Sequence, residues 1–170
     1  MGTITFITGG ARSGKSHYAQ QLAERWSSNP VYLATAHIWD EDFAARVRRH
    51  QADRDERWTT IEEEKYLSRH HLEGKTVMLD CVTLWLTNLF YNSNESIDAI
   101  LEEAMQEWTR FVTQDIRLIA VSNELGMGIH PDNEIARKFA DLQGWMNQYI
   151  AAMSDAVYLM IAGIPVRIKG

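Results

Sequence analysis

Eight residues that follow the first apolar run of the chain have the clearest chemical purpose. They are Gly9, Gly10, Ala11, Arg12, Ser13, Gly14, Lys15 and Ser16, which match G-x-x-x-x-G-K-[S/T] at every fixed position. Glycines let such a loop curl until backbone N–H groups point at phosphate oxygens, and the start of the following helix adds partial positive charge. The lysine of this pattern reaches the β- and γ-phosphates, and the hydroxyl group ligates Mg²⁺. The sequence therefore predicts a nucleoside triphosphate site, without saying what is done with the triphosphate.

A carboxylate is the second candidate. Asp80 ends the apolar run Val77-Met78-Leu79, which predicts an acidic side chain at the carboxyl end of a strand. This is the Walker-B arrangement, in which the acid lies near the metal ion. An acid at the end of a strand is also common by chance, so the phosphate loop is what supports the metal role. We expect Ser16 and Asp80 to hold Mg²⁺ together.

A basic cluster over residues 46–54 contains the third candidate, His50. Four of the 17 lysines and arginines of the chain fall within these nine positions. On a helix, Arg46, Arg49, His50 and Arg54 would lie roughly on one face. Nearby cations favour a neutral imidazole, which is a nucleophile, and guanidinium groups bind phosphate oxygens. The alternative is a solvated basic helix face with a spectator histidine, and composition alone favours that alternative.

The remaining histidines suggest no metal centre, because none of them has the spacing of a structural zinc site. His17 follows the loop serine, His70 and His71 lie in a charged stretch, and His37 and His130 lie in expected loops.

Strands and helices alternate along the chain. β-Branched and apolar runs predict strands over 3–8, 31–34, 76–79, 117–122, 156–161 and 166–168, with an extended piece over 57–61. Apolar spacing of three and four predicts helices over 15–25, 43–51, 84–90, 97–112 and 131–149, the last capped by Asp132. The stretch 156–166 is the most apolar and should be buried. This order predicts an α/β fold as one domain over residues 1–170, with a mostly parallel sheet and helices on both faces.

Composition excludes several classes of protein. A chain of 170 residues, 45% hydrophobic and 24% charged, suits one folded domain and excludes global disorder. The formal charge of -6 disfavours a general nucleic-acid binder. The first residues lack the features of a signal peptide, no apolar run approaches the ~20 residues that span a bilayer, and the single cysteine cannot form an intrachain disulfide. We therefore expect a cytoplasmic protein with no membrane span.

In combination, these residues resemble the bifunctional adenosylcobinamide kinase / adenosylcobinamide-phosphate guanylyltransferase family over essentially the whole chain. The resemblance rests on the phosphate loop and on further segments in a fixed order. Those segments are 32–36, 45–47 leading to His50, 54–62, 79–83 with 87–89, and 121–131. The phosphate loop joined to Asn-Glu-x-Gly-Met-Gly-Ile is far more specific than a phosphate loop alone.

The resemblance implies a RecA-like P-loop fold, a homotrimer and two reactions. The family phosphorylates the aminopropanol hydroxyl of adenosylcobinamide with ATP or GTP, and then transfers GMP from GTP to that phosphate. The transfer passes through a GMP–histidine intermediate, and His50 is the matching position, which reverses its interpretation as a spectator. Glu62 is suited to accept hydrogen bonds from guanine N1–H and N2–H₂. Further nucleotide contacts are implied at Ala34, Thr35, Ala36, Gln51, Ala52, Asp53 and Arg54, besides the loop and Asp80.

The sequence departs from the family in two places and leaves alternatives open. The family often has Glu at the position of Asp80, and some members have Pro where this chain has Asp55. No base is assigned for the kinase step, for which Glu124 and Asp80 are candidates. The chain could instead be a P-loop kinase for another small molecule, without GMP transfer. It could also be a nucleotide-gated interaction protein with no enzymatic activity.

Overall fold

The computed structural model describes residues 2–38, 40–52, 54–91, 93–94 and 96–170, and in the second helix it omits the side chains of residues 42, 43, 46 and 49–51. Strands and helices alternate as predicted. In chain order the elements are β1 (Thr3–Gly9), α1 (Lys15–Trp26), β2 (Val31–Ala34), α2 (Glu41–Ala52), β3 (Thr59–Glu62), η1 (Leu67–Arg69), β4 (Thr76–Asp80), α3 (Val82–Tyr91), α4 (Ile97–Val112), β5 (Arg117–Val121), η2 (Leu125–Met127), α5 (Glu134–Met153), β6 (Ala156–Ile161) and β7 (Ile164–Lys169).

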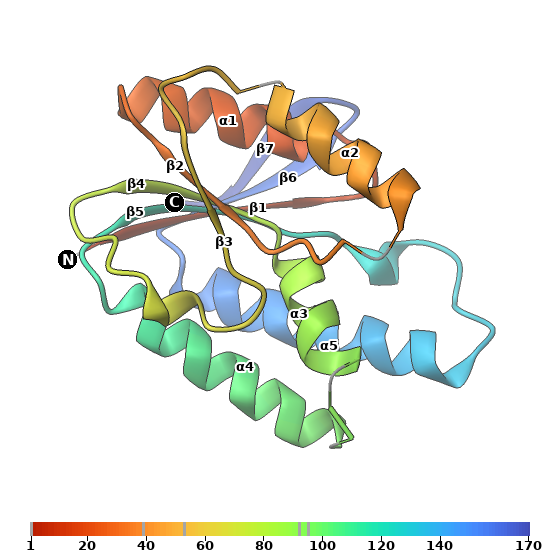
Figure 1. Cartoon of the computed structure of the whole chain (residues 1–170). Coiled ribbons are helices and arrows are strands. Elements are labelled where there is room, and N and C mark those ends of the chain that lie inside the picture. The colour runs from red at the N-terminus through yellow and green to blue at the C-terminus, as the bar shows by residue number, and fades with distance from the viewer. Residues whose placement is uncertain (1, 39, 53, 92, 95) are drawn as a thin grey trace.

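Seven strands form one sheet within the described ranges, in the order β3-β2-β4-β5-β1-β6-β7. All pairings are parallel except that of β6 with β7. Helices α1 and α2 lie on one side of the sheet, and α3, α4 and α5 lie on the other (Figure 1). The predicted α/β architecture is confirmed. Because parallel strands point the same way, their carboxyl ends meet at one edge, which is where open α/β sheets bind ligands.

The core has two layers because neighbouring strand residues point to opposite faces of the sheet. In β4, Val77 and Leu79 pack into the layer under α3, α4 and α5, which contains Trp85 and Trp108. Met78 packs into the layer under α1. Strand β4 is therefore buried on both faces, and it holds its last residue, Asp80, at a fixed place on the carboxyl edge.

Helix α5 begins after Asn133, not after Asp132. The Asn133 side chain accepts a hydrogen bond from the backbone N–H of Ala136 at 2.7 Å, which satisfies one free donor of the first turn. The prediction of Asp132 as the cap is therefore wrong by one residue. At 20 residues α5 is the longest described helix, yet neither it nor any other described helix is long and apolar enough to cross a membrane.

The prediction that residues 156–166 form buried strand is wrong for the second half of the stretch. Strand β6 buries Val157 and Met160, but all six residues of β7 are exposed. Ile164 is 64% exposed. An apolar run does not distinguish an inner strand from an edge strand, and β7 is the antiparallel edge of this sheet.

Candidate functional site

The phosphate loop is held at the carboxyl end of β1 by close contact with the β6–β7 hairpin. Gly14, the N-cap of α1, has φ 92°, a conformation that side chains rarely adopt. A Cβ atom at Gly14 would lie 3.1 Å from the Gly163 Cα, and one at Gly9 would lie 2.7 Å from the Met160 carbonyl oxygen. The Gly163 N–H also donates to the Ser13 carbonyl at 2.9 Å. Both fixed glycines of the motif are therefore required by this packing as well as by phosphate binding.

Lys15 is buried inside the loop, where its side chain is 7% exposed. Its ammonium group donates to the Gly10 carbonyl oxygen and lies 3.5 Å from the Ser13 hydroxyl. Burial lowers the pKa of Lys15, and the negative potential of Cys81 and Asp80 opposes that shift. The loop thus places a cation at its centre, where phosphate oxygens would be stronger acceptors than carbonyls.

Asp80 lies at the predicted strand end and is oriented by a tyrosine from the neighbouring strand. The Tyr32 hydroxyl donates to Asp80 Oδ2 at 3.0 Å. Burial raises the pKa of Tyr32 and the charge of Asp80 adds to the shift, so the phenol remains a neutral donor at physiological pH. The hydrogen bond fixes one carboxylate oxygen. Ser16 and Asp80 line the same cavity, as a shared metal site would require.

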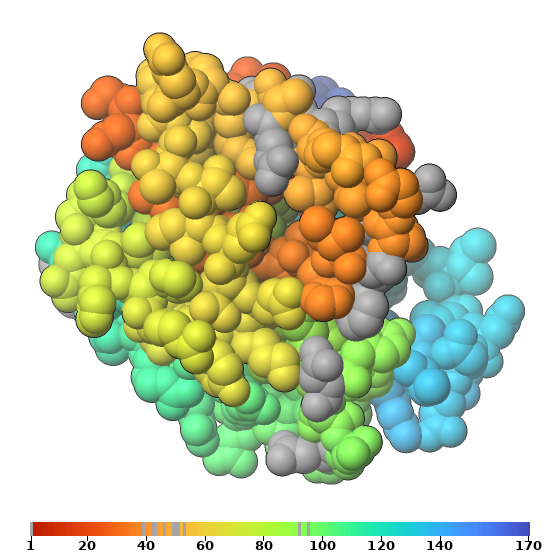
Figure 2. All heavy atoms as spheres, in the orientation of Figure 1, coloured from red at the N-terminus to blue at the C-terminus, as the bar shows by residue number. Residues whose placement is uncertain are grey.

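A cavity of about 400 Å³ opens at the carboxyl edge of the sheet. Figure 2 shows α2 (orange) beside the segment that contains β3 (yellow), the two elements that border it. The cavity is lined by Ser16, Tyr32, Ala34, Ala36, His37, Ile38, Val47, Arg54, Thr60, Glu62, Glu64, Asp80 and Leu84. It therefore brings together the end of the phosphate loop, Asp80 and four further residues of the predicted nucleotide set, which are Ala34, Ala36, Arg54 and Glu62.

Arg54 lies in the cavity, but not on the helix face that the sequence predicted. Helix α2 ends at Ala52, so Arg54 follows the helix. Its guanidinium carbon lies 3.4 Å from the centroid of the Tyr32 ring, a cation–π contact. The same tyrosine binds Asp80. The Arg54 guanidinium group therefore contacts the tyrosine that donates a hydrogen bond to Asp80, the acid of the predicted metal site.

The predicted nucleophile belongs to α2, whose backbone the structure describes. The side chains of His50 and Gln51, and Asp53 as a whole, lie outside the described residues, so the structure does not test these predictions. Val47 lines the cavity. His50 lies three positions later in the same helix.

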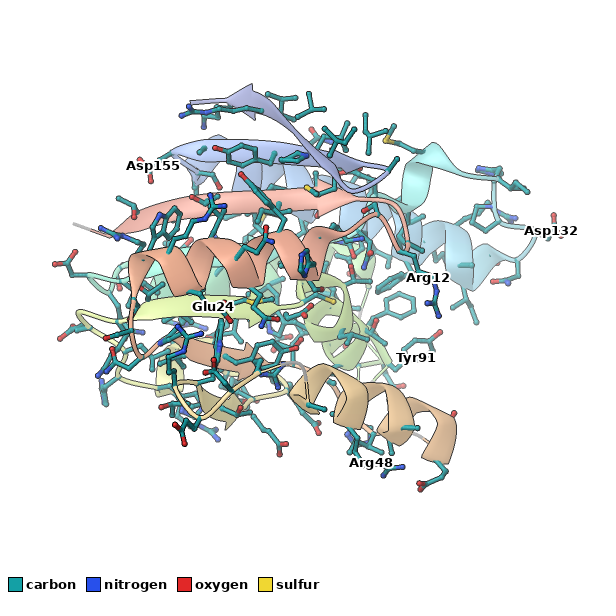
Figure 3. The ribbon with its side chains drawn as sticks, turned by 90° about the horizontal axis from the view of Figure 1, so that it is seen from above. Arg12, Glu24, Arg48, Tyr91, Asp132 and Asp155 are labelled. Atoms are coloured by element: carbon teal, nitrogen blue, oxygen red, sulfur yellow. The ribbon has the colours of Figure 1, made fainter. Side chains whose placement is uncertain are left out.

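Arginines at the site edge differ in their surroundings. Arg48 projects outward from α2 and pairs with Glu41 at 2.6 Å (Figure 3). Arg12 extends from the exposed part of the phosphate loop (Figure 3). Arg48, which the sequence did not assign to the predicted basic face, is therefore engaged away from the cavity, and the side chains of Arg46 and Arg49 lie outside the described residues.

Thr35 holds two strand ends together at the floor of the site. Its hydroxyl donates to the Cys81 carbonyl at 2.7 Å and accepts from the Cys81 N–H at 2.9 Å. The Thr35 carbonyl accepts from the Asn88 side chain at 2.7 Å. Thr35 is fully buried, and its neighbours Ala34 and Ala36 line the cavity. Small side chains at those two positions leave room for a ligand.

Cys81 follows Asp80 and is shielded from reagents. Burial and the adjacent Asp80 raise the pKa of its thiol to about 12. Because the thiolate is the reactive form, we expect Ellman's reagent at pH 8 to leave Cys81 unmodified in the native protein and to label one thiol after unfolding in guanidinium. Native protein that reacts as fast as unfolded protein would contradict this burial.

Sequence reasoning missed several residues of the site, among them His37 and Glu64. His37 Nδ1 lies 2.7 Å from Glu64 Oε1, and both residues line the cavity. The available signal was position: His37 follows β2 by three residues, at the edge where Asp80 lies, and Glu64 follows β3 by two. Residues just after parallel strands share that edge even where they have no motif.

Comparison with known proteins decides the family. The family model described as "CobU: Cobinamide kinase / cobinamide phosphate guanyltransferase" matches residues 5–168, which include the loop, Asp80 and the elements around the cavity. The chain belongs to this family.

Two curated proteins are similar to this chain over nearly its full length and theirs. The chain is 37% identical to "Bifunctional adenosylcobalamin biosynthesis protein CobU" of Escherichia coli, across 98% of this chain and 99% of that protein. It is 38% identical to "Bifunctional adenosylcobalamin biosynthesis protein CobP" of Pseudomonas aeruginosa, across 96% of each. The chain is therefore an enzyme, a bifunctional cobinamide kinase and cobinamide-phosphate guanylyltransferase of adenosylcobalamin biosynthesis.

Solved structures share the fold at low sequence identity. An ATPase from the type III secretion system of pathogenic bacteria aligns with a TM-score of 0.54 and 10% identity, over 94% of this chain and 51% of that one. Such a likeness shows the fold alone. It confirms the prediction of a RecA-like P-loop fold.

Proposed function

We propose that this enzyme binds the triphosphate of ATP or GTP on Gly9–Ser16, with Mg²⁺ held by Ser16 and Asp80. The observation that supports it is the single cavity lined by Ser16, Asp80, Arg54 and Glu62. A hydroxyl and a carboxylate fit Mg²⁺, which takes one or two protein ligands together with phosphate oxygens and waters. When bound, the ion would offset charge that develops on the phosphate oxygens.

In the guanylyl transfer, we place the nucleophile at His50. A neutral ring nitrogen of His50 attacks the α-phosphorus of GTP, a P–N bond forms, and the bond to pyrophosphate breaks. A phosphate oxygen of adenosylcobinamide phosphate then attacks the same phosphorus and releases the imidazole. Lys15 and Arg54 supply positive charge on either side of the transferred group. Gln51, Ala52 and Asp53 would line the nucleotide beside His50, and Ala34, Thr35 and Ala36 would border it from β2.

Three further features complete the proposal: residues 1–170 act as one catalytic domain, three copies assemble, and the enzyme works in the cytoplasm. The exposed apolar residues Ile161, Ile164, Val166 and Ile168 form a surface that contact between subunits would cover.

Both reactions consume nucleoside triphosphates, which supports a cytoplasmic location for the enzyme. The proposed assembly can be tested by its mass. Analytical ultracentrifugation should give a mass of three chains.

Incubation with GTP labelled at the α-phosphate tests the proposal. We expect a label on the protein that acid removes and base does not, because the bond is P–N. Mass spectrometry should locate a GMP adduct on the peptide that contains His50. A P-loop kinase without transferase activity would phosphorylate its substrate and carry no adduct. A nucleotide-gated interaction protein would show neither event.

Glu62 should decide the preference for guanine over hypoxanthine. The exposed Glu62 carboxylate lies in the cavity, and a charged hydrogen bond to the guanine 2-amino group is worth about 1.5–3 kcal/mol. The Glu62→Gln variant should therefore lose roughly tenfold or more of the preference for GTP over inosine triphosphate. The measurement is the ratio of protein labelling rates with the two nucleotides.

Glu64→Gln is the matched control, because Glu64 lines the same cavity but is engaged by His37 at 2.7 Å. In this variant the ratio of labelling rates with GTP and inosine triphosphate should equal that of the unmodified enzyme. If the ratio of labelling rates with GTP and inosine triphosphate is the same in both variants, Glu62 does not bind guanine.

A further inference from the structure

The segment that follows β5 enters the space between the phosphate loop and Asp80. Strand β5 lies between β1 and β4, and Val121 is paired with Ile7 on one side and with Asp80 on the other. Three residues later, the Glu124 N–H donates to the Gly9 carbonyl at 3.0 Å. Glu124 therefore lies beside the phosphate loop, because it follows β5, the strand next to β1.

The Glu124 carboxylate is anchored through one oxygen. Oε1 accepts from the Thr8 hydroxyl at 2.7 Å and from the Asn147 side-chain amide at 3.2 Å. Within the part of the chain that the structure describes, no hydrogen bond or ion pair engages Oε2. The group therefore has a fixed orientation and a second oxygen that can accept a proton.

A buried polar network from α5 keeps this carboxylate in place. Asn147 is 6% exposed and Gln143 is 1% exposed. Asn147 also donates to the Asn123 carbonyl at 3.0 Å, and its own amide oxygen accepts from Ser122 at 2.7 Å and from Gln143 at 2.9 Å. Burying amides costs free energy unless they are hydrogen-bonded. Both polar atoms of the Asn147 amide are bonded, whereas the Gln143 amide oxygen has no partner among the described residues. The bonds converge on the segment that ends at Glu124.

The other carboxylates of the carboxyl edge are less suited to act as a base in the kinase step. Asp80 accepts from Tyr32 and is the proposed Mg²⁺ ligand, and an oxygen bound to Mg²⁺ is a poor proton acceptor. Glu62 ends β3 and Glu64 follows it, and β2, β4 and β5 separate β3 from β1. Among these described carboxylates, Glu124 follows the strand adjacent to the phosphate loop.

We propose that Glu124 is the general base of the kinase step and that Asn147 is its positioning residue. Glu124 Oε2 takes the proton of the aminopropanol hydroxyl as the oxygen attacks the γ-phosphorus. The new O–P bond forms while the bond between the γ-phosphorus and the β,γ-bridging oxygen breaks, and its electron pair leaves with the nucleoside diphosphate. This inference rests on the proposed placement of the triphosphate on Gly9–Ser16.

The Glu124→Gln variant tests the inference, because glutamine keeps the Oε1 acceptor for Thr8 and Asn147 but cannot take a proton. We expect phosphorylation of adenosylcobinamide to slow by about 10²–10⁴-fold, the usual contribution of a general base. Transfer of GMP to adenosylcobinamide phosphate, supplied as substrate, should stay within about threefold, because no proton is removed from that phosphate. In Glu124→Ala, added formate should restore part of the kinase rate.

Glu134→Gln is the matched control, since Glu134 is an exposed carboxylate at the start of α5 that pairs with Lys138. Its kinase rate and its response to formate should equal those of the unmodified enzyme. The inference is overturned if Glu124→Gln keeps its kinase rate, if both reactions slow equally, or if formate has no effect on Glu124→Ala. Failure of the triphosphate placement would appear separately, as a Lys15 variant that keeps both activities.

Discussion

Replacing Lys15 with methionine should reduce both activities by about a hundredfold to a thousandfold, the usual cost of removing one preorganised group that stabilises developing charge. Lys15 is the buried cation of the loop, held between the Gly10 carbonyl and the Ser13 hydroxyl. The proposal places it against the β- and γ-phosphates in both reactions. Because the proposal assigns both steps to the same triphosphate site, we expect both rates to fall together.

The fold should survive this replacement. Burial lowers the pKa of Lys15, which shows that the surroundings disfavour its charged form. Methionine has a similar length and needs no hydrogen bonds, so the midpoint of thermal unfolding should not fall. Kinase assays, protein labelling from GTP and circular dichroism measure the three quantities.

Lys138→Met is the control for the loss of a positive charge, because Lys138 lies exposed on α5 and pairs with Glu134. It should leave both rates unchanged. A Lys15→Met enzyme that keeps either reaction at its normal rate would mean that the triphosphate of that reaction is bound elsewhere.

The phosphate loop and the position of Asp80 could be predicted because each depends on local sequence. The loop needs glycines where the chain turns sharply, and Gly14 does adopt a φ of 92°. Asp80 needs only to follow a buried strand, and the alternation of Val77, Met78 and Leu79 between two core layers identifies that strand. Local patterns therefore predicted that the phosphate loop and Asp80 lie at the carboxyl edge of the sheet.

Contacts between distant segments could not be predicted in this way. Arg54 lies between α2 and β3 and stacks on Tyr32 of β2, and no spacing in the sequence predicts that contact. Asn147 reads as an ordinary polar residue of a helix, yet it binds the Glu124 carboxylate 23 positions earlier in the chain. Contacts of this kind can be identified only when the topology is known. Here Tyr32 orients Asp80, and Asn147 orients Glu124.

The His50→Ala variant should separate the two activities. Without the imidazole no P–N bond can form, so labelling from GTP should disappear and GMP transfer should fall by at least about a thousandfold, as happens when a covalent nucleophile is removed. In the proposed mechanism the kinase step uses the phosphate loop, Mg²⁺ and a base, but no covalent intermediate. Phosphorylation of adenosylcobinamide with ATP should therefore continue, and chromatography of the corrinoid products should show the phosphate accumulating.

His37→Ala is the control that makes this result specific to one histidine. His37 lines the same cavity, and its ring nitrogen lies 2.7 Å from Glu64, so it is the rival imidazole among the described residues of the site. If His50 is the nucleophile, His37→Ala keeps the label and His50→Ala loses it. The opposite pattern would assign the intermediate to His37. In that case the hydrogen bond to Glu64 would orient the attacking ring of His37.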